Sequence, residues 1–168
     1  MANGAVTVGS LTATAITTGG AGTPGTVTGT WSLTSGSRFE ATYADLAEYY
    51  EADREYEVGT VLVFGGDKEV TIGNTKADHR VAGVVSNNAA YTMNQECQGT
   101  KVLIALQGRV PCRVVGKVSK GDLLVTSNIK GVAVSVGGDA KAGTIIGKAL
   151  ENYDSDHIGT IEVAVGRT

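Results

Sequence analysis

The amino-acid sequence predicts an all-β fold, and two features of its composition support this prediction. The chain of 168 residues contains 24 glycines but only 2 prolines, which is about twice the glycine content of an average protein. These glycines separate short runs of Val, Ile, Leu and Thr, a pattern typical of many tight turns that connect short strands. No Gly-X-Y period is present, so a collagen-like structure is excluded.

Nine short apolar runs follow one another along the chain after residue 57. Each run is bounded by Gly, Asn or Asp, the residues that favour turns. Several runs are apolar at consecutive positions, which indicates burial on both faces. We therefore expect a short-stranded barrel or β-clip-like domain over residues 57–168. The runs are Val58–Phe64, Glu69–Ile72, Arg80–Ser86, Lys101–Leu106, Arg109–Val115, Leu123–Thr126, Val132–Val136, Thr144–Leu150 and Thr160–Val165.

Residues 1–37 are expected to form an extended, Gly/Thr-rich arm. They contain no Asp, Glu, Lys, Arg or His, whereas disordered tails are usually charged or rich in proline. Thr and Val favour an extended backbone, but this segment cannot bury enough apolar surface on its own. We therefore expect the arm to dock onto other protein chains through Val27 and Trp31. A flexible leader is the alternative, and a lone tryptophan disfavours it because the ring would have nothing to bury against.

The composition changes abruptly at Arg38, and residues 38–56 are predicted to form an acidic helical junction. Between Glu40 and Glu57 the chain carries seven acidic residues interleaved with tyrosines. Thr42-x-x-Asp45 resembles a capping box, and the apolar residues that follow can share one helical face. We expect one short helix, over about residues 44–53.

Charge and composition exclude several classes of function. The formal net charge of −3 and the pI near 5.4 give no general attraction for nucleic acid or an anionic membrane. No stretch approaches the ~20 apolar residues of a membrane span, and the N-terminus does not have the pattern of a signal peptide. Cys97 and Cys112 are too few for a disulfide framework and are not in a metal-binding spacing. We expect no cofactor, no nucleic-acid partner and no membrane partner.

The phrase YADLAEYYE at residues 43–51 is the most specific motif in the chain. Together with the later phrases Gly59–Val61 and Gly83–Ser86, it resembles the start of the C-terminal domain of tailed-phage tail fibres and neck appendages. The Gly/Thr-rich stretch before it is similar to the lead-in of this domain in tail-fibre proteins. Residues 108–150 are also similar to the β-rich domains of small trimeric capsid cement proteins.

This resemblance implies a non-enzymatic structural protein of a tailed-phage virion, assembled in the host cytoplasm. The first expectation is a homotrimeric decoration, or cement, protein that stabilises the head by binding the major capsid protein or other virion proteins. A tail-fibre or head-fibre module for host adhesion is the alternative. We expect Leu46, Tyr49 and Tyr50 to contribute to the interface. We also expect the apolar side chains of five strand residues to be divided between the core and the trimer interface. These residues are Val61, Val63, Val84, Ile104 and Leu106.

A second alternative follows from neck-appendage relatives in which this domain is an autoproteolytic chaperone. The matching carboxylates are Asp45 and Glu48. A carboxylate pair can activate water or a side chain if one carboxyl raises the pKa of the other. The competing interpretation is an acidic, solvated first helical turn stabilised by the helix dipole.

One further acidic cluster has the appearance of a divalent-cation loop. Asp154 and Asp156 lie in the phrase ENYDSDHIG, where Asn152 adds another oxygen ligand. The phrase does not have the glycine spacing of an EF-hand, and polar hairpin loops are common. No metal site is therefore expected, with Asp154 and Asp156 as the candidates if one exists.

Overall fold

The computed structural model describes residues 19–20, 23–24, 30 and 32–166. The chain divides into two units, Met1–Phe39 and Glu40–Thr168. In the first unit, strands β1 (Gly19–Gly20) and β2 (Thr23–Pro24) form a short antiparallel pair. The predicted interface residues Val27 and Trp31 lie outside the described residues.

The second unit is built from strands, and the all-β prediction is confirmed. No helix occurs among the described residues, so none of them forms a helix long and apolar enough to cross a membrane. The strands are β3 (Asp45–Glu51), β4 (Val61–Phe64), β5 (Val70–Ile72), β6 (Val81–Val85), β7 (Tyr91–Met93), β8 (Lys101–Val118), β9 (Leu123–Thr126), β10 (Ala133–Ser135), β11 (Ile145–Ala149) and β12 (Tyr153–Val165).

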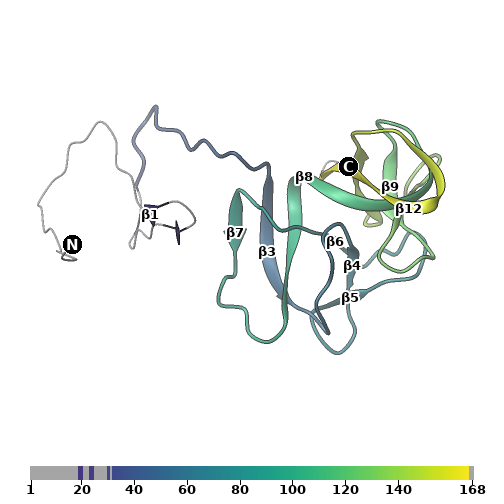
Figure 1. The fold of residues 1–168 in the computed structure, drawn as a ribbon, viewed down its shortest axis with the longest axis horizontal. Helices are drawn as coiled ribbons and strands as arrows, with labels where there is room; N and C mark the ends of the chain where they lie inside the picture. Colours follow the sequence, from purple (N-terminus) through teal and green to yellow (C-terminus); the bar gives the residue numbers. More distant parts are fainter. Residues whose placement is uncertain (1–18, 21–22, 25–29, 31, 167–168) are drawn as a thin grey trace, which may run out of the picture. The chain divides into compact units, whose positions relative to one another are not determined.

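Five of these strands close into a small barrel. Strand β10 pairs with β9, β9 with β11, β11 with β12, and β12 with β8, all in antiparallel orientation. A parallel pair between Ala133 and Val114 then joins β10 to β8 and completes the circuit. The barrel lies at the end of the fold where β9 and β12 are labelled in Figure 1.

The remaining strands form a curled sheet on the first part of β8. Strands β3 and β6 both pair with β8, and β6 continues to β4 and then to β5. An isolated parallel bridge between Ala52 and Val70 joins the end of β3 to β5. The circuit of paired strands from β8 through β6, β4, β5 and β3 therefore closes on β8. Short strand β7 runs parallel to β3 along its other edge (Figure 1).

Strand β8 is shared by the barrel and the curled sheet, and Gly108 marks the change from one to the other. Gly108 lies opposite Asp45 of β3 and opposite Val165 of β12. Its φ is +111°, and an added Cβ would lie only 2.1 Å from the carbonyl oxygen of Ala44. Only glycine tolerates both this backbone conformation and this close approach.

Two apolar clusters form the core. The first fills the barrel and the sheet face next to it, with Leu124 and Val114 fully buried. The second lies within the curled sheet around Leu62. The five residues expected to be divided between core and interface pack within a single chain. Four of them are buried and the fifth is half-buried, so they do not offer an exposed apolar face. These are Val61, Val63, Val84, Ile104 and Leu106.

The predicted helix over residues 44–53 is wrong, because residues 45–51 form strand β3. This segment pairs with β8 on one edge and with β7 on the other. Its backbone hydrogen bonds are therefore made to neighbouring strands. The alternation of Asp45 and Ala47 with Leu46 and Glu48 suits a strand buried mainly on one face, and tertiary pairing outweighs the local capping signal.

Candidate functional site

Strand β3 carries most of the residues that the sequence singled out. Side chains alternate along a strand, so Asp45, Ala47 and Tyr49 share one face, which we call the Asp45 face. Leu46, Glu48 and Tyr50 share the other, which we call the Tyr50 face. Asp45 and Ala47 are buried, whereas the remaining residues of the strand are half-buried.

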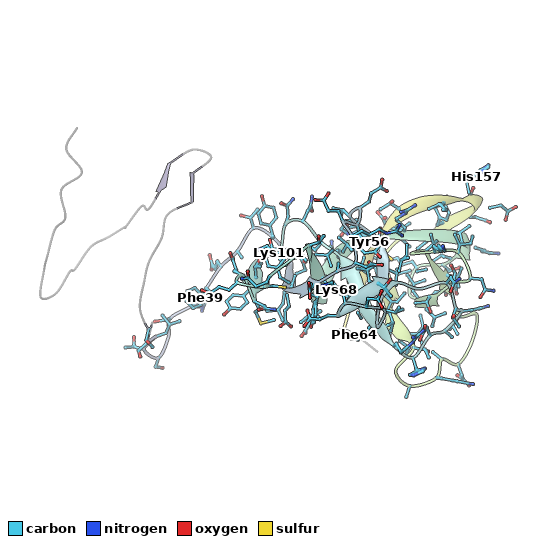
Figure 2. The ribbon with its side chains drawn as sticks, turned by 90° about the horizontal axis from the view of Figure 1, so that it is seen from below. Phe39, Tyr56, Phe64, Lys68, Lys101 and His157 are labelled. Carbon is cyan, nitrogen blue, oxygen red and sulfur yellow. The ribbon has the colours of Figure 1, made fainter. Side chains whose placement is uncertain are left out.

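The Tyr50 face joins the core of the curled sheet. The Tyr50 hydroxyl donates a hydrogen bond of 2.8 Å to Oε2 of Glu48, and its ring packs edge-on against Phe64 at a centroid distance of 5.6 Å. Burial and this hydrogen bond to a carboxylate raise the pKa of Tyr50 to about 12. Phe64 remains 42% exposed and is labelled in Figure 2. The Tyr50 face therefore contributes to packing, and the partly exposed Phe64 ring lies at its edge.

The Asp45 face is chemically different. Asp45 is only 5% exposed, and its Oδ2 has no hydrogen-bond partner among the described residues. Further along the same face, the Lys101 ammonium lies over the ring of Tyr49, 4.4 Å from the centroid. Such a cation–π contact orders both side chains. The face thus combines an unsatisfied buried carboxylate with an ordered aromatic residue.

Two hollows lie along the Asp45 face and form a groove. The first, of about 330 Å³, is lined by Asp45 and the second, of about 390 Å³, by Tyr49. Both are also lined by Ser86 and Asn87, which follow β6. The first hollow is completed by Thr42, Tyr43, Ala44, Asn88, Arg109, Val110, Pro111 and Glu162.

The structure does not bring Asp45 and Glu48 together as a pair. The two residues are three positions apart on a strand and so point to opposite faces. Glu48 is engaged by the Tyr50 hydroxyl, whereas Asp45 is buried on the other side. The alternative of a solvated helical turn fails for Asp45, because this residue is neither helical nor exposed.

The two candidate metal ligands lie at the first part of β12. Asp154 and Asp156 are both exposed. The chain bulges between Ser155 and Gly159, and the Tyr153 hydroxyl closes this bulge with a 3.0 Å hydrogen bond to the carbonyl of His157. The His157 side chain projects at the margin of the molecule (Figure 2). Among the described residues, no group of three or more His, Cys, Asp or Glu side chains is arranged to hold a metal ion.

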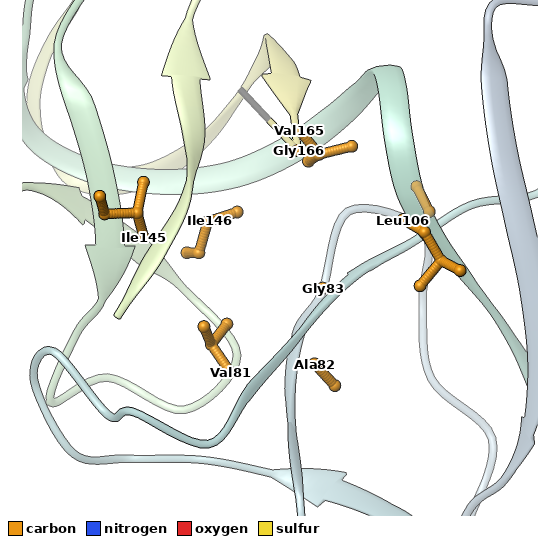
Figure 3. Close-up of a pocket in the computed structure, with 9 residues that line it drawn as sticks. Val81, Ala82, Gly83, Leu106, Ile145, Ile146, Val165 and Gly166 are labelled. Carbon is orange, nitrogen blue, oxygen red and sulfur yellow. The ribbon is translucent and has the colours of Figure 1, made fainter. Parts of the chain in front are cut away.

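A separate apolar pocket lies between the curled sheet and the barrel (Figure 3). Its volume is about 120 Å³, and neither a titratable nor a nucleophilic side chain lines it. It therefore offers space to an apolar group but no chemistry. The side chains around it are mainly those of Val81, Ala82, Leu106, Ile145, Ile146 and Val165.

The sequence singled out Asp45 and Tyr49 but did not predict which residues of other segments lie beside them. Ser86, Asn87 and Arg109 come from two other segments, and only the fold brings them to β3. The one local signal was the polar pair Asn87–Asn88 directly after an apolar run, which by itself indicates only a turn.

Comparisons with known proteins find a likeness to a solved structure. No family model matches the chain, and no curated protein is significantly similar to it. A crystal structure of the N base of the head fiber gp8.5 in bacteriophage phi29 is similar at 15% sequence identity, with a TM-score of 0.41. The alignment covers 71% of this chain and 93% of that chain.

Proposed function

We propose that this chain is a structural component of a tailed-phage virion, and that it acts as a homotrimeric decoration protein on the head. The observation that carries the proposal is the phrase YADLAEYYE at residues 43–51, which resembles a domain of phage fibres and neck appendages. In the structure this phrase supplies strand β3, which lines the groove with Asp45 and Tyr49. The most specific motif of the sequence therefore supplies residues to two hollows of the fold.

The architecture suits a mechanical role. One strand of 18 residues is shared by the barrel and the curled sheet, and both have apolar cores. A load on either part is thus carried into the other through continuous backbone and its ladder of hydrogen bonds. A decoration protein of this kind would add contact area where capsid subunits meet, with copies of itself and the major capsid protein as partners.

A head-fibre or tail-fibre module is the second candidate. The Gly/Thr-rich stretch before residue 38 favours it, because this stretch is similar to the lead-in of phage tail-fibre domains. In that role the protein binds other virion proteins through one end and presents loops to a host surface. Both candidates place the protein in the virion.

Copy number separates these two candidates. Quantitative mass spectrometry of purified particles of the encoding phage should find the chain, and a decoration protein should approach the abundance of the major capsid protein. A few copies per particle would favour the fibre module. Particles that do not contain the chain would contradict both. Antibody labelling of intact particles, with particles from a deletion strain as the control, would then give its position.

Autoproteolysis has its own test. Intact mass measurement of the wild-type chain, Asp45→Asn and Glu48→Gln compares their lengths directly. The structural role predicts full-length chains in all three, apart from the mass of the substitution. A wild-type chain that is shorter than both variants would show cleavage and overturn that assignment.

A further inference from the structure

We propose that the Asp45 hollow receives the ammonium group of a lysine from a second copy of this chain. The inference rests on the self-association in the proposed function and deepens it by naming the residue that receives the partner.

The first step is the state of Asp45 itself. Its carboxylate is buried, and Oδ2 has no donor within hydrogen-bond distance among the described residues. Native structures rarely leave a buried charged oxygen in this state, because its lost hydration is not replaced.

The second step is the hollow beside Asp45. Its charged side chains are two carboxylates, Asp45 and Glu162, against one cation, Arg109. Tyr43 also lines the hollow and is 55% exposed. Tyrosine is enriched at protein–protein interfaces. The space therefore suits a positively charged donor on a protein partner.

The chain's own neighbouring cation does not fill this role. Arg109 lines the same hollow, yet the ion pairs found among the described residues do not include one between Arg109 and Asp45. The Arg109 residue is exposed, and its backbone N–H donates to the carbonyl of Ala44. Arg109 thus forms part of the wall of the hollow without an ion pair to Asp45, which lies at the buried side of the hollow.

The third step is the source of the cation. Several cations are already engaged: Lys68 and Arg80 in ion pairs, and Lys101 over an aromatic ring. Six exposed lysines do not belong to any ion pair found among the described residues. Five of them lie in the barrel, and the sixth lies in a loop bonded to Asn128. They are Lys76, Lys117, Lys120, Lys130, Lys141 and Lys148.

The charge distribution favours a second copy as the partner. Residues 40–107, which include β3, carry 11 acidic and 5 basic residues, a net charge of −6. Residues 108–166, which include the rest of the barrel, carry 6 acidic and 7 basic residues, a net charge of +1. The curled sheet of one copy and the barrel of another are therefore complementary in charge, whereas two curled sheets would repel each other.

Lysine reactivity tests this pairing directly on the full chain. An amine-acetylating reagent is applied below and above the concentration at which the chain associates, and each lysine is followed by mass spectrometry. At least one of the six lysines should lose most of its reactivity on association, and this protection should disappear in Asp45→Asn. Equal reactivity of all six before and after association would overturn the inference.

Association strength provides the matched measurement. Sedimentation velocity over a concentration series should show that Asp45→Asn weakens self-association at least tenfold, about 1.4 kcal/mol, and that added salt weakens the wild type. Asp67→Asn, on an exposed turn, is the control and should associate like the wild type. Circular dichroism checks that both variants are folded. Association of Asp45→Asn as tight as that of the wild type, or a wild type that stays monomeric, would overturn the inference. The copy number in particles tests the proposed function independently of this inference.

Discussion

The barrel and the curled sheet share strand β8 but differ in what they bury. The barrel has a core of apolar residues: Leu124 and Val163 are fully buried, and burial raises the pKa of the Cys112 thiol to about 12. The curled sheet instead buries two carboxylates, Asp45 and Asp78. Both regions therefore have an apolar core, and in the proposed function the curled sheet also supplies the acidic surface that binds partners.

Core truncations in the two regions test whether they fold together. Leu124→Ala in the barrel and Leu62→Ala in the curled sheet each remove a side chain with no exposed surface. Each should lower the free energy of unfolding by about 2–5 kcal/mol. Because β8 belongs to both regions, thermal unfolding should remain a single transition that shifts down in both variants. Separate transitions, with only one shifted by each substitution, would show that the regions fold independently.

The crossing point between the regions should be the next most sensitive position. Gly108→Ala places a Cβ against the carbonyl of Ala44 and forces a side chain onto a φ of +111°. We expect a loss of at least about 2 kcal/mol, measured by urea unfolding. Gly137→Ala is the matched control, since Gly137 also has a positive φ, +70°, but nothing lies within 4 Å of an added Cβ. If both variants lose the same amount of stability, the positive φ alone causes the effect, and the contact with the Ala44 carbonyl does not contribute.

Asp78 is a buried carboxylate with a hydrogen-bond partner, and the pH dependence of stability tests this contact. Asp78 accepts two side-chain hydrogen bonds from Arg80, at 3.1 and 2.7 Å. These bonds hold the pKa of Asp78 at about 2. A lowered folded-state pKa stabilises the fold above the ordinary carboxyl pKa of about 4, and this stability is lost as the pH falls toward 2.

Arg80→Gln should therefore lower the stability at neutral pH and should reduce the loss of stability between pH 4 and pH 2. Urea unfolding at several pH values measures both effects. Arg113→Gln is the control, because its partner Glu57 is 85% exposed and their contact is 3.4 Å long. An unchanged acid dependence in Arg80→Gln would show that another group controls it.

The smallest effect is expected on the Tyr50 face. Tyr50→Phe removes the 2.8 Å hydrogen bond to Glu48 but keeps the ring against Phe64. The expected loss is about 0.5–1.5 kcal/mol, and the variant should lose the tyrosine that ionises near pH 12 in an absorbance titration. If that high-pH step persists in the variant, it belongs to another tyrosine.

The comparison also shows what the sequence could predict. The strands of the barrel were predicted, because they appear in the sequence as short apolar runs separated by turn residues. The run Leu123–Thr126 coincides with β9, and the runs before and after Gly108 are the two parts of β8. Strand β3 was predicted as a helix, because its periodicity was ambiguous and its pairing partners are distant in sequence. The burial of Asp45 depends on the close approach of Gly108, 63 residues further along, and no local pattern carries that information.

The most direct test of the account is the mass of the full chain in solution. Light scattering coupled to size exclusion, at micromolar concentration, should give three times the chain mass of 17.2 kDa if copies associate as trimers. High salt should lower that mass, because the proposed contact joins unlike charges. A mass of one chain at every concentration and salt level would contradict the account.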